Sequence, residues 1–400
     1  MKKLKVLMLI LLSIIFILEV GIILVQRGAI SYLAKDKIIK ELSKRLKCEV
    51  KIGRVDLQDP KKAIFGKVKL SFPDSTILSI KEVVFFYNLR EVLTKREEFS
   101  LGNLKRVELV SPVLTVSFVK TGRQKASLPK ELSTSFKGEV LLKDGLLKIV
   151  DQKGEAISTF RKIEGGLDFS QLCPSFSLKG EFLPTTNILL TGQIDPSPLE
   201  ISFDLKADTV DLKTFSSYLK EVEAKGSIAD LCLKGRLSKD GFNYQLKTAL
   251  KKVDLKVANL KEPVKEIQGT ILVDKERGVV ARFEDLRFKW QDTPFLGEGS
   301  LSLEGRRARL LLSNLKYGEF RLGRIEVEGD LNRKRRAFIG HLVAKELKLP
   351  YLKKGEGIES DLTYEKGALT LTALRIGEEV KGSLRIEELG ANYEGFLKYE

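Results

Sequence analysis

Ile201 to Ala207 reads Ile-Ser-Phe-Asp-Leu-Lys-Ala, and Val253 to Val257 reads Val-Asp-Leu-Lys-Val. Apolar and polar residues alternate in both stretches, which is the pattern of a β-strand with one apolar and one polar face. The alternation begins after Cys48 and recurs at residues 50–57, 68–72, 242–246, 325–327 and 384–386. It predicts a mainly β protein built from many one-faced strands.

Turn signals such as Asp144-Gly145 and Asp240-Gly241 separate the predicted strands. At roughly 14 residues per strand and turn, the ~350 residues after Cys48 hold about 25 strands. Only three segments favour short helices, namely Leu89–Arg96, Val210–Leu219 and Leu347–Leu352. The apolar faces must therefore meet another sheet, curl on themselves or contact something that is not protein. We expect an elongated, curled antiparallel sheet, on the order of 120 Å long at ~4.8 Å per strand.

The N-terminal segment Val6 to Val25 contains twenty residues with one charge, Glu19. About twenty apolar residues are needed for an α-helix to cross a bilayer. Three lysines precede the segment, so the positive-inside rule predicts a cytoplasmic N-terminus and places the bulk of the chain beyond the membrane. A cleaved signal peptide is the competing interpretation, although its apolar core would be shorter, ~7–15 residues. The predicted anchor, within residues 1–27, includes Val6, Leu12, Phe16, Glu19 and Val25.

Two features near this anchor leave alternatives open. The side chain of Glu19 is either protonated or snorkels to the membrane surface, or else it makes a polar contact with another membrane helix. Residues 28–47 have apolar side chains about every four positions and predict an amphipathic helix. That helix either caps the first strands or lies on the membrane surface.

The chain carries 70 Lys and Arg against 54 Asp and Glu, a formal net charge of +16. The basic residues are dispersed and mostly alternate with apolar ones, as on the solvated faces of strands. The densest cluster, Arg333 to Arg336, is predicted to be a hairpin turn. The pattern argues against a nucleic-acid partner, and the excess charge serves either solubility or attraction to anionic lipid headgroups.

Residues that carry common chemistries are scarce. The one histidine, His341, lies in a strand-like segment, and the three cysteines, Cys48, Cys173 and Cys232, lack metal-site spacing. Phosphate-loop, zinc-protease and nucleophile-elbow motifs are missing from the sequence. We therefore predict that the protein is not an enzyme and needs no cofactor or metal. The cysteines are either three free thiols or include a Cys173–Cys232 bridge.

Three phrases behind the anchor occur in a characteristic order: Leu42 to Leu57, Ile80 to Leu93 and Leu104 to Val116. With the anchor, they resemble the N-terminal region of the AsmA-like family, which includes the inner-membrane subunit of the translocation and assembly module. Val264 to Asp274 and Asp292 to Leu301 are similar to later strands of that family.

The resemblance implies a β-taco, a curled sheet whose apolar groove carries phospholipid acyl chains through the periplasm. It implies an inner-membrane protein with one transmembrane helix, an N-terminal β region at 48–120 and a continuation of the groove at 121–400. Family members are linked to lipid transport between membranes and to outer-membrane biogenesis. Because bridge-forming members are much longer, a shorter module that hands lipid to an outer-membrane or periplasmic partner protein fits this chain better.

The residues predicted to line the groove take one set of alternating positions. They are Phe203, Leu205, Tyr244, Leu246, Leu255, Val257, Val273, Leu303 and Val327. The same residues would form the core of an ordinary β-sandwich, which is the alternative for each of them. A second candidate function is a scaffold for outer-membrane protein assembly, in which exposed strand edges pair with client strands.

Overall fold

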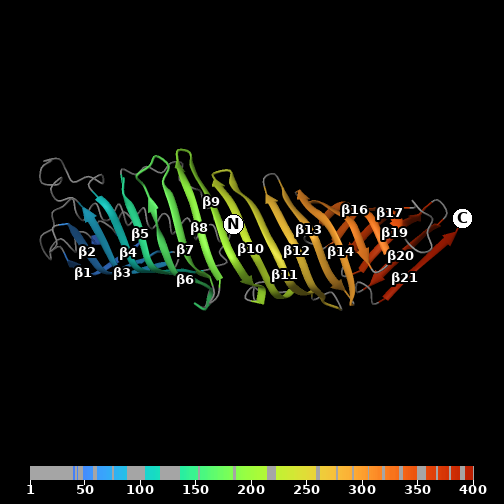
Figure 1. Cartoon of the computed structure of the whole chain (residues 1–400), viewed down its shortest axis with the longest axis horizontal. Coiled ribbons are helices and arrows are strands. Elements are labelled where there is room, and N and C mark those ends of the chain that lie inside the picture. The colour runs from blue at the N-terminus through green and yellow to red at the C-terminus, as the bar shows by residue number, and fades with distance from the viewer. Residues whose placement is uncertain are drawn as a thin grey trace. The chain divides into compact units, whose positions relative to one another are not determined.

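A computed structural model (Figure 1) gives the fold of this chain. The residues it describes are 39–40, 43, 48–56, 61–73, 76–87, 104–117, 136–151, 154–182, 186–213, 222–257, 262–275, 278–290, 292–304, 306–317, 320–332, 337–348, 357–365, 368–377, 380–387 and 392–399.

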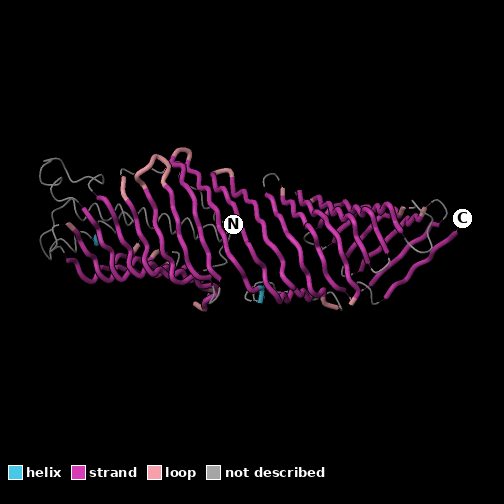
Figure 2. Tube along the Cα trace, in the orientation of Figure 1, coloured by secondary structure: helices cyan, strands magenta, loops and turns pink. Residues whose placement is uncertain are grey.

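The described chain is almost entirely β-strand (Figure 2). The first nine strands are β1 (Glu49–Asp56), β2 (Lys62–Ser71), β3 (Ile77–Tyr87), β4 (Leu104–Ser117), β5 (Glu139–Val150), β6 (Ala156–Asp168), β7 (Ser175–Phe182), β8 (Thr186–Pro196) and β9 (Leu199–Asp211). The next six are β10 (Val222–Ser238), β11 (Gly241–Val257), β12 (Val264–Lys275), β13 (Val279–Trp290), β14 (Thr293–Glu304) and β15 (Arg307–Tyr317). The last six are β16 (Phe320–Asn332), β17 (Ala337–Lys348), β18 (Ile358–Glu365), β19 (Ala368–Ile376), β20 (Val380–Glu387) and β21 (Asn392–Tyr399).

All 21 strands belong to one hydrogen-bonded sheet, which confirms the mainly β prediction. From β1 to β8 and from β11 to β21, strands that follow one another in the chain pair antiparallel, with β4 and β5 as the exception. These two run parallel, with Arg106 beside Glu139 and Ser117 beside Val150. The prediction of an antiparallel sheet is wrong for this pair. Parallel neighbours need a connection of a dozen or more residues, and the segment between β4 and β5 is long enough to provide it.

Two compact units divide the chain, and each is described by itself. Unit 1 comprises Met1–Lys206 and Gly235–Phe242, and unit 2 comprises Ala207–Lys234 and Asn243–Glu400.

Helix is confined, within the described residues, to positions 39, 40 and 43 and a short 3₁₀ turn at 212–213. No helix of the described residues is long and apolar enough to span a bilayer. The predicted anchor at 1–27, with Val6, Leu12, Phe16, Glu19 and Val25, lies outside the described residues, as does most of the helix predicted at 28–47.

The short turn or helix predicted at Val210–Leu219 is present in part as the 3₁₀ turn at 212–213, where the backbone N–H of Lys213 donates to Oδ1 of Asp211 at 2.9 Å. The one predicted at Leu347–Leu352 is wrong at Leu347, which belongs to β17. The one predicted at Leu89–Arg96 lies outside the described residues.

Unit 1 has a packed apolar core. Cross-strand pairs keep its apolar residues on one face, in rows such as Val50, Leu70, Leu78 and Leu114, or Ala63, Phe85, Val107, Val140 and Leu167. Phe85 is 1% exposed and Val107 is 0% exposed, and the rings of Phe65 and Phe85 meet edge to face with centroids 5.4 Å apart. Burial of this kind stabilises a sheet by about 25 cal/mol per Å2 of apolar surface.

The cysteines of the structure are free. Cys48 is buried in unit 1, and burial raises the pKa of its thiol to about 11. Cys173 is exposed, because it lies in the loop between β6 and β7.

Many strands contain a β-bulge near their middle, which the alternation did not predict. In each, two polar or small residues separate apolar residues that face the same side, as in Leu250-Lys-Lys-Val253, Phe283-Glu-Asp-Leu286, Leu312-Ser-Asn-Leu315 and Leu371-Thr-Ala-Leu374. The third residue of each has a positive φ of about 50°, namely 49° at Lys252, 51° at Asp285, 54° at Asn314 and 51° at Ala373. The strands are correspondingly bent in Figure 2.

The bulges also correct one turn prediction. Asp144-Gly145 lies inside β5, where the register shifts on both sides of Gly145, and not in a turn. Asp240 does lie in a turn, and Gly241 begins the following strand. The two dipeptides look alike because Asp and Gly both tolerate positive φ, which turns and bulges each require.

Substitution of Gly269, in β12, tests its close packing against the bulge of the neighbouring strand β13. Gly269 has a φ of 141°, and an added Cβ would lie 2.9 Å from the backbone oxygen of Glu284 and 3.0 Å from Cα of Leu286. We expect Gly269→Ala to destabilise the full chain by about 2–4 kcal/mol. Amide hydrogen exchange over residues 264–290 should accelerate.

Gly154→Ala is the matched control, because Gly154 also has a positive φ, 85°, but an added Cβ would have nothing within 4 Å. Its cost should stay near 1 kcal/mol. Equal exchange rates in the two variants would contradict crowding at Gly269.

Candidate functional site

An extended one-sided apolar surface in unit 2 is built by cross-strand pairs. Its central row runs through neighbouring strands from β11 to β17 and consists of Leu246, Val273, Ala281, Leu301, Leu310, Val327 and Leu342. Directly paired residues lie on the same side of a sheet, so all seven side chains share one face.

Two further rows flank the central one on the same face. One consists of Thr248, Ile271, Phe283, Gly299, Leu312, Ile325, Ala344, Ile358, Ile376 and Val380. The other consists of Val279, Leu303, Ala308, Gly329, Gly340, Leu362, Leu371 and Leu384. We call these three rows, with the residues that continue them along each strand, the apolar face of unit 2.

The opposite face of the same strands is charged. One of its rows consists of Lys247, Leu272, Arg282, Ser300, Leu311, Glu326, Val343, Glu359, Arg375 and Lys381. Ion pairs stabilise it: Glu326 pairs with Arg309 and, at 3.0 Å, with Arg324. Burial raises the pKa of the Glu326 carboxyl, but the hydrogen bonds and charges of the two arginines together lower it by more. The net effect is a lowered pKa. This face is therefore suited to water.

The apolar face of unit 2 is only partly shielded from solvent. Its central row is half-buried at every position, whereas the equivalent rows of β1 to β4 in unit 1 are buried. The only described helix in unit 2 is the turn at 212–213, so no described helix covers these rows (Figure 2). Contiguous apolar surface of this extent marks a binding surface more often than a solvated one.

An aromatic cluster lies at one end of the apolar face. The ring of Phe288 stacks on that of Phe295 with centroids 4.8 Å apart. The ring centroid of Trp290 lies 6.4 Å from that of Phe295. These residues come from the adjacent strands β13 and β14. Trp290 is the only tryptophan of the chain, which makes it a natural spectroscopic reporter for this face.

Six of the nine residues predicted to line a groove are brought together here. Leu246, Val273 and Val327 belong to the central row, and Leu303 belongs to a flanking row. Tyr244 and Leu255 extend the same face along β11. Val257 ends β11, but its side chain lies outside the described residues.

Phe203 and Leu205 belong to β9 in unit 1. Phe203 is 7% exposed and stacks on Phe242 with centroids 6.1 Å apart, as a core residue does. Leu205 is half-buried. The structure therefore does not join these two residues to the unit 2 rows, and it adds Leu301, Leu310 and Leu342, which the alternation had not singled out.

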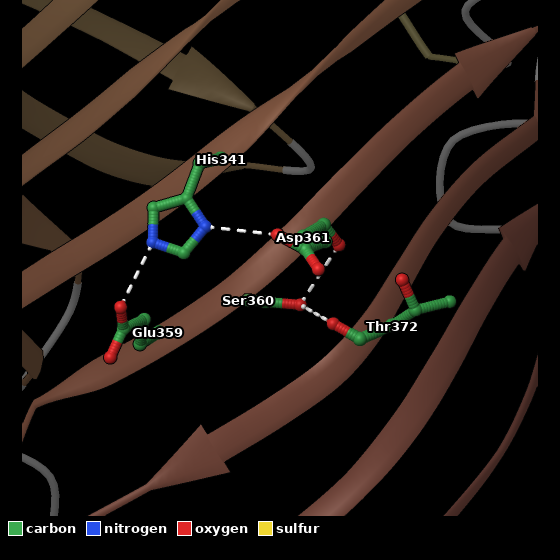
Figure 3. A network of polar contacts seen from close by, with 5 residues as sticks. All are labelled: His341, Glu359, Ser360, Asp361 and Thr372. Carbon is green, nitrogen blue, oxygen red and sulfur yellow. Dashed lines mark hydrogen bonds and ion pairs between the residues drawn. The ribbon is translucent and has the colours of Figure 1, made fainter.

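The polar face of unit 2 holds the one histidine between two carboxylates (Figure 3). Nδ1 of His341 lies 3.1 Å from Oδ1 of Asp361, and Nε2 lies 3.0 Å from Oε1 of Glu359. The hydrogen bond to Asp361 is the main cause of a raised His341 pKa. Burial opposes the rise, and the hydrogen bond to Glu359 and the charges of both carboxylates add to it.

This cluster does not form a nucleophilic triad. Ser360 is buried on the other face, opposite Leu342, and its hydroxyl donates to the backbone oxygens of Thr372 and Asp361 (Figure 3). Its oxygen therefore has no geometry for activation by His341. Within the described residues, no group of His, Cys, Asp and Glu side chains could hold a metal ion.

Comparison of the sequence with protein-family models finds no match, and comparison with curated proteins finds none either.

The raised pKa of His341 predicts a pH-dependent contact. A protonated imidazole donates to both carboxylates, so the contact stabilises the fold fully below the ordinary pKa of about 6.5. The stabilisation is lost as the pH rises through the higher folded-state pKa. Since His341 is the only histidine, an NMR titration of its ring protons in the full chain should give one midpoint above 6.5.

Asp361→Asn should lower that midpoint, because Asp361 is the main cause of the shift. The pKa of His341 is raised even though Lys and Arg residues lie nearby, including Arg375 opposite Glu359. A midpoint at or below 6.5 in the unsubstituted chain would show that the two hydrogen bonds do not form in solution.

Proposed function

We propose that this protein binds phospholipid acyl chains on the apolar face of unit 2 and supports lipid transport between two membranes. In this proposal it is anchored in the inner membrane by residues 1–27, its β region lies in the periplasm, and it performs no catalysis. The observation that carries the proposal is the half-buried central row, which joins seven strands on one face while the other face is charged.

The physical argument concerns what can cover such a face. Each CH2 group of an acyl chain that leaves water contributes about 0.8 kcal/mol, and the strand surface demands no particular headgroup for this gain. The strands of the face have 8 to 17 residues, and β13, with 12 residues, spans roughly 40 Å at ~3.3 Å per residue. One leaflet of a bilayer has about 15 Å of hydrocarbon, so a strand is long enough for a whole acyl chain.

The resemblance of residues 42–116 to the AsmA-like family supports the same proposal, since it implies an apolar groove for lipid. The order of the three phrases and the apolar surface of unit 2 are independent observations, because they come from different parts of the chain.

A photo-crosslinking experiment separates the two faces of one strand. A benzophenone amino acid is placed at Leu310, in the central row, and the full chain is irradiated in cells or after reconstitution with phospholipid. Lipid adducts, detected by mass spectrometry, should form at position 310 at several times the level found at position 311.

Leu311 is the matched control, because it is the same residue type in the same strand and is also half-buried, but it pairs with Ser300 and Glu326 on the charged face. Adducts at both positions in equal yield, or at neither, would overturn the proposed acyl contact.

The assembly-scaffold alternative has one observation in its favour. Within the described residues, β21 pairs on one side with β20, and its Phe396 is 66% exposed. A client strand could add to such an edge. Crosslinking to protein from position 396, with no lipid adduct at 310, would favour this second function.

A further inference from the structure

One charged side chain lies on the otherwise apolar face of unit 2. Among the described residues of β11 to β20 that share this face, Lys275 is the only one with a formal charge. Its position follows from register: Lys275 pairs with Tyr244, two residues along from the pair of Leu246 and Val273.

Contacts around Lys275 confirm that its side chain is directed along this face. Its Nζ lies 5.8 Å from the centre of the Tyr244 ring, a cation–π arrangement. The neighbouring carboxylate, Asp274, lies on the opposite face and accepts a hydrogen bond of 3.0 Å from Gln245. Lys275 is half-buried, so its methylene stem lies on apolar surface.

The two ends of the strands differ in chemistry. Lys275 is the last residue of β12, beside the phenol of Tyr244, whereas the other end of the next strand carries the aromatic cluster of Phe288, Trp290 and Phe295. A lysine and a tyrosine at the border of an apolar surface match the headgroup level of a bilayer, where both residue types are favoured. An amphiphile on this face would therefore be oriented.

We propose that Lys275, with Tyr244, binds the phosphate of a glycerophospholipid headgroup, and that the acyl chains extend from there along β11 and β12. The inference rests on the proposed function and deepens it, since it names the headgroup chemistry and the direction of the lipid. Gly269, also in β12, lies about 20 Å from Lys275 at ~3.3 Å per residue. That length is sufficient for the ~15 Å of one acyl layer.

A competition between two lipids with identical acyl chains tests the phosphate contact. The purified full chain is incubated with equal amounts of dioleoyl phosphatidate and dioleoylglycerol, and bound lipid is extracted and quantified by mass spectrometry. The unsubstituted chain should enrich the phosphatidate about tenfold, the ratio expected from one charge-assisted contact. Lys275→Gln should reduce the ratio to near one, and Lys275→Arg should keep it.

Lys247→Gln is the matched control, because Lys247 is exposed on the charged face of β11 and should leave the ratio unchanged. Circular dichroism confirms that each variant is folded. A Lys275→Gln ratio equal to that of the unsubstituted chain, with both lipids bound, would overturn the headgroup inference alone. If neither lipid binds the unsubstituted chain, the proposed function fails and this inference fails with it.

Discussion

The fold depends on one constraint: every strand must keep its apolar residues on the same face as its neighbours. Side chains alternate along a strand, so a shift of one residue would turn the whole apolar set to the other side. Many strands of this chain are bent by a β-bulge, which adds one residue to the strand. If the side chains went on alternating through that extra residue, every apolar side chain after the bulge would turn to the charged face. The pairs Lys251-Lys252 and Glu284-Asp285 solve this problem, because both members of each pair lie on the charged face and the apolar row resumes after them.

The two units differ in how deeply their apolar rows are buried. In unit 1 the apolar rows of β1 to β4 are buried, with Phe85 and Val107 almost inaccessible to water, and the gain in burial free energy stabilises the fold. In unit 2 the central row is half-buried at every position, so the described chain alone does not gain the full burial free energy of these residues. A bound acyl chain would realise it. The same property that weakens unit 2 as a core would therefore give it affinity for lipid.

Much of the fold could be predicted from the sequence, because alternation such as Val253 to Val257 follows directly from strand geometry. The bulges could not, since Asp144-Gly145 has the composition of a turn and only pairing with β6 places it inside a strand. Leu310 was missed for a related reason. It begins three consecutive leucines, whose faces cannot be assigned by alternation, and its pairing with Leu301 and Val327 decides the matter.

The most direct test of acyl-chain binding uses the fluorescence of Trp290, the only tryptophan, which lies beside Phe295 on the apolar face. The full chain is titrated with phospholipid that carries bromine atoms on its acyl chains, since bromine quenches indole at contact. Binding on this face predicts strong, saturable quenching that unbrominated lipid reverses by competition, together with reduced quenching by iodide in water. Unchanged fluorescence, with Trp290 still accessible to iodide at saturating lipid, would contradict binding of acyl chains on the apolar face of unit 2.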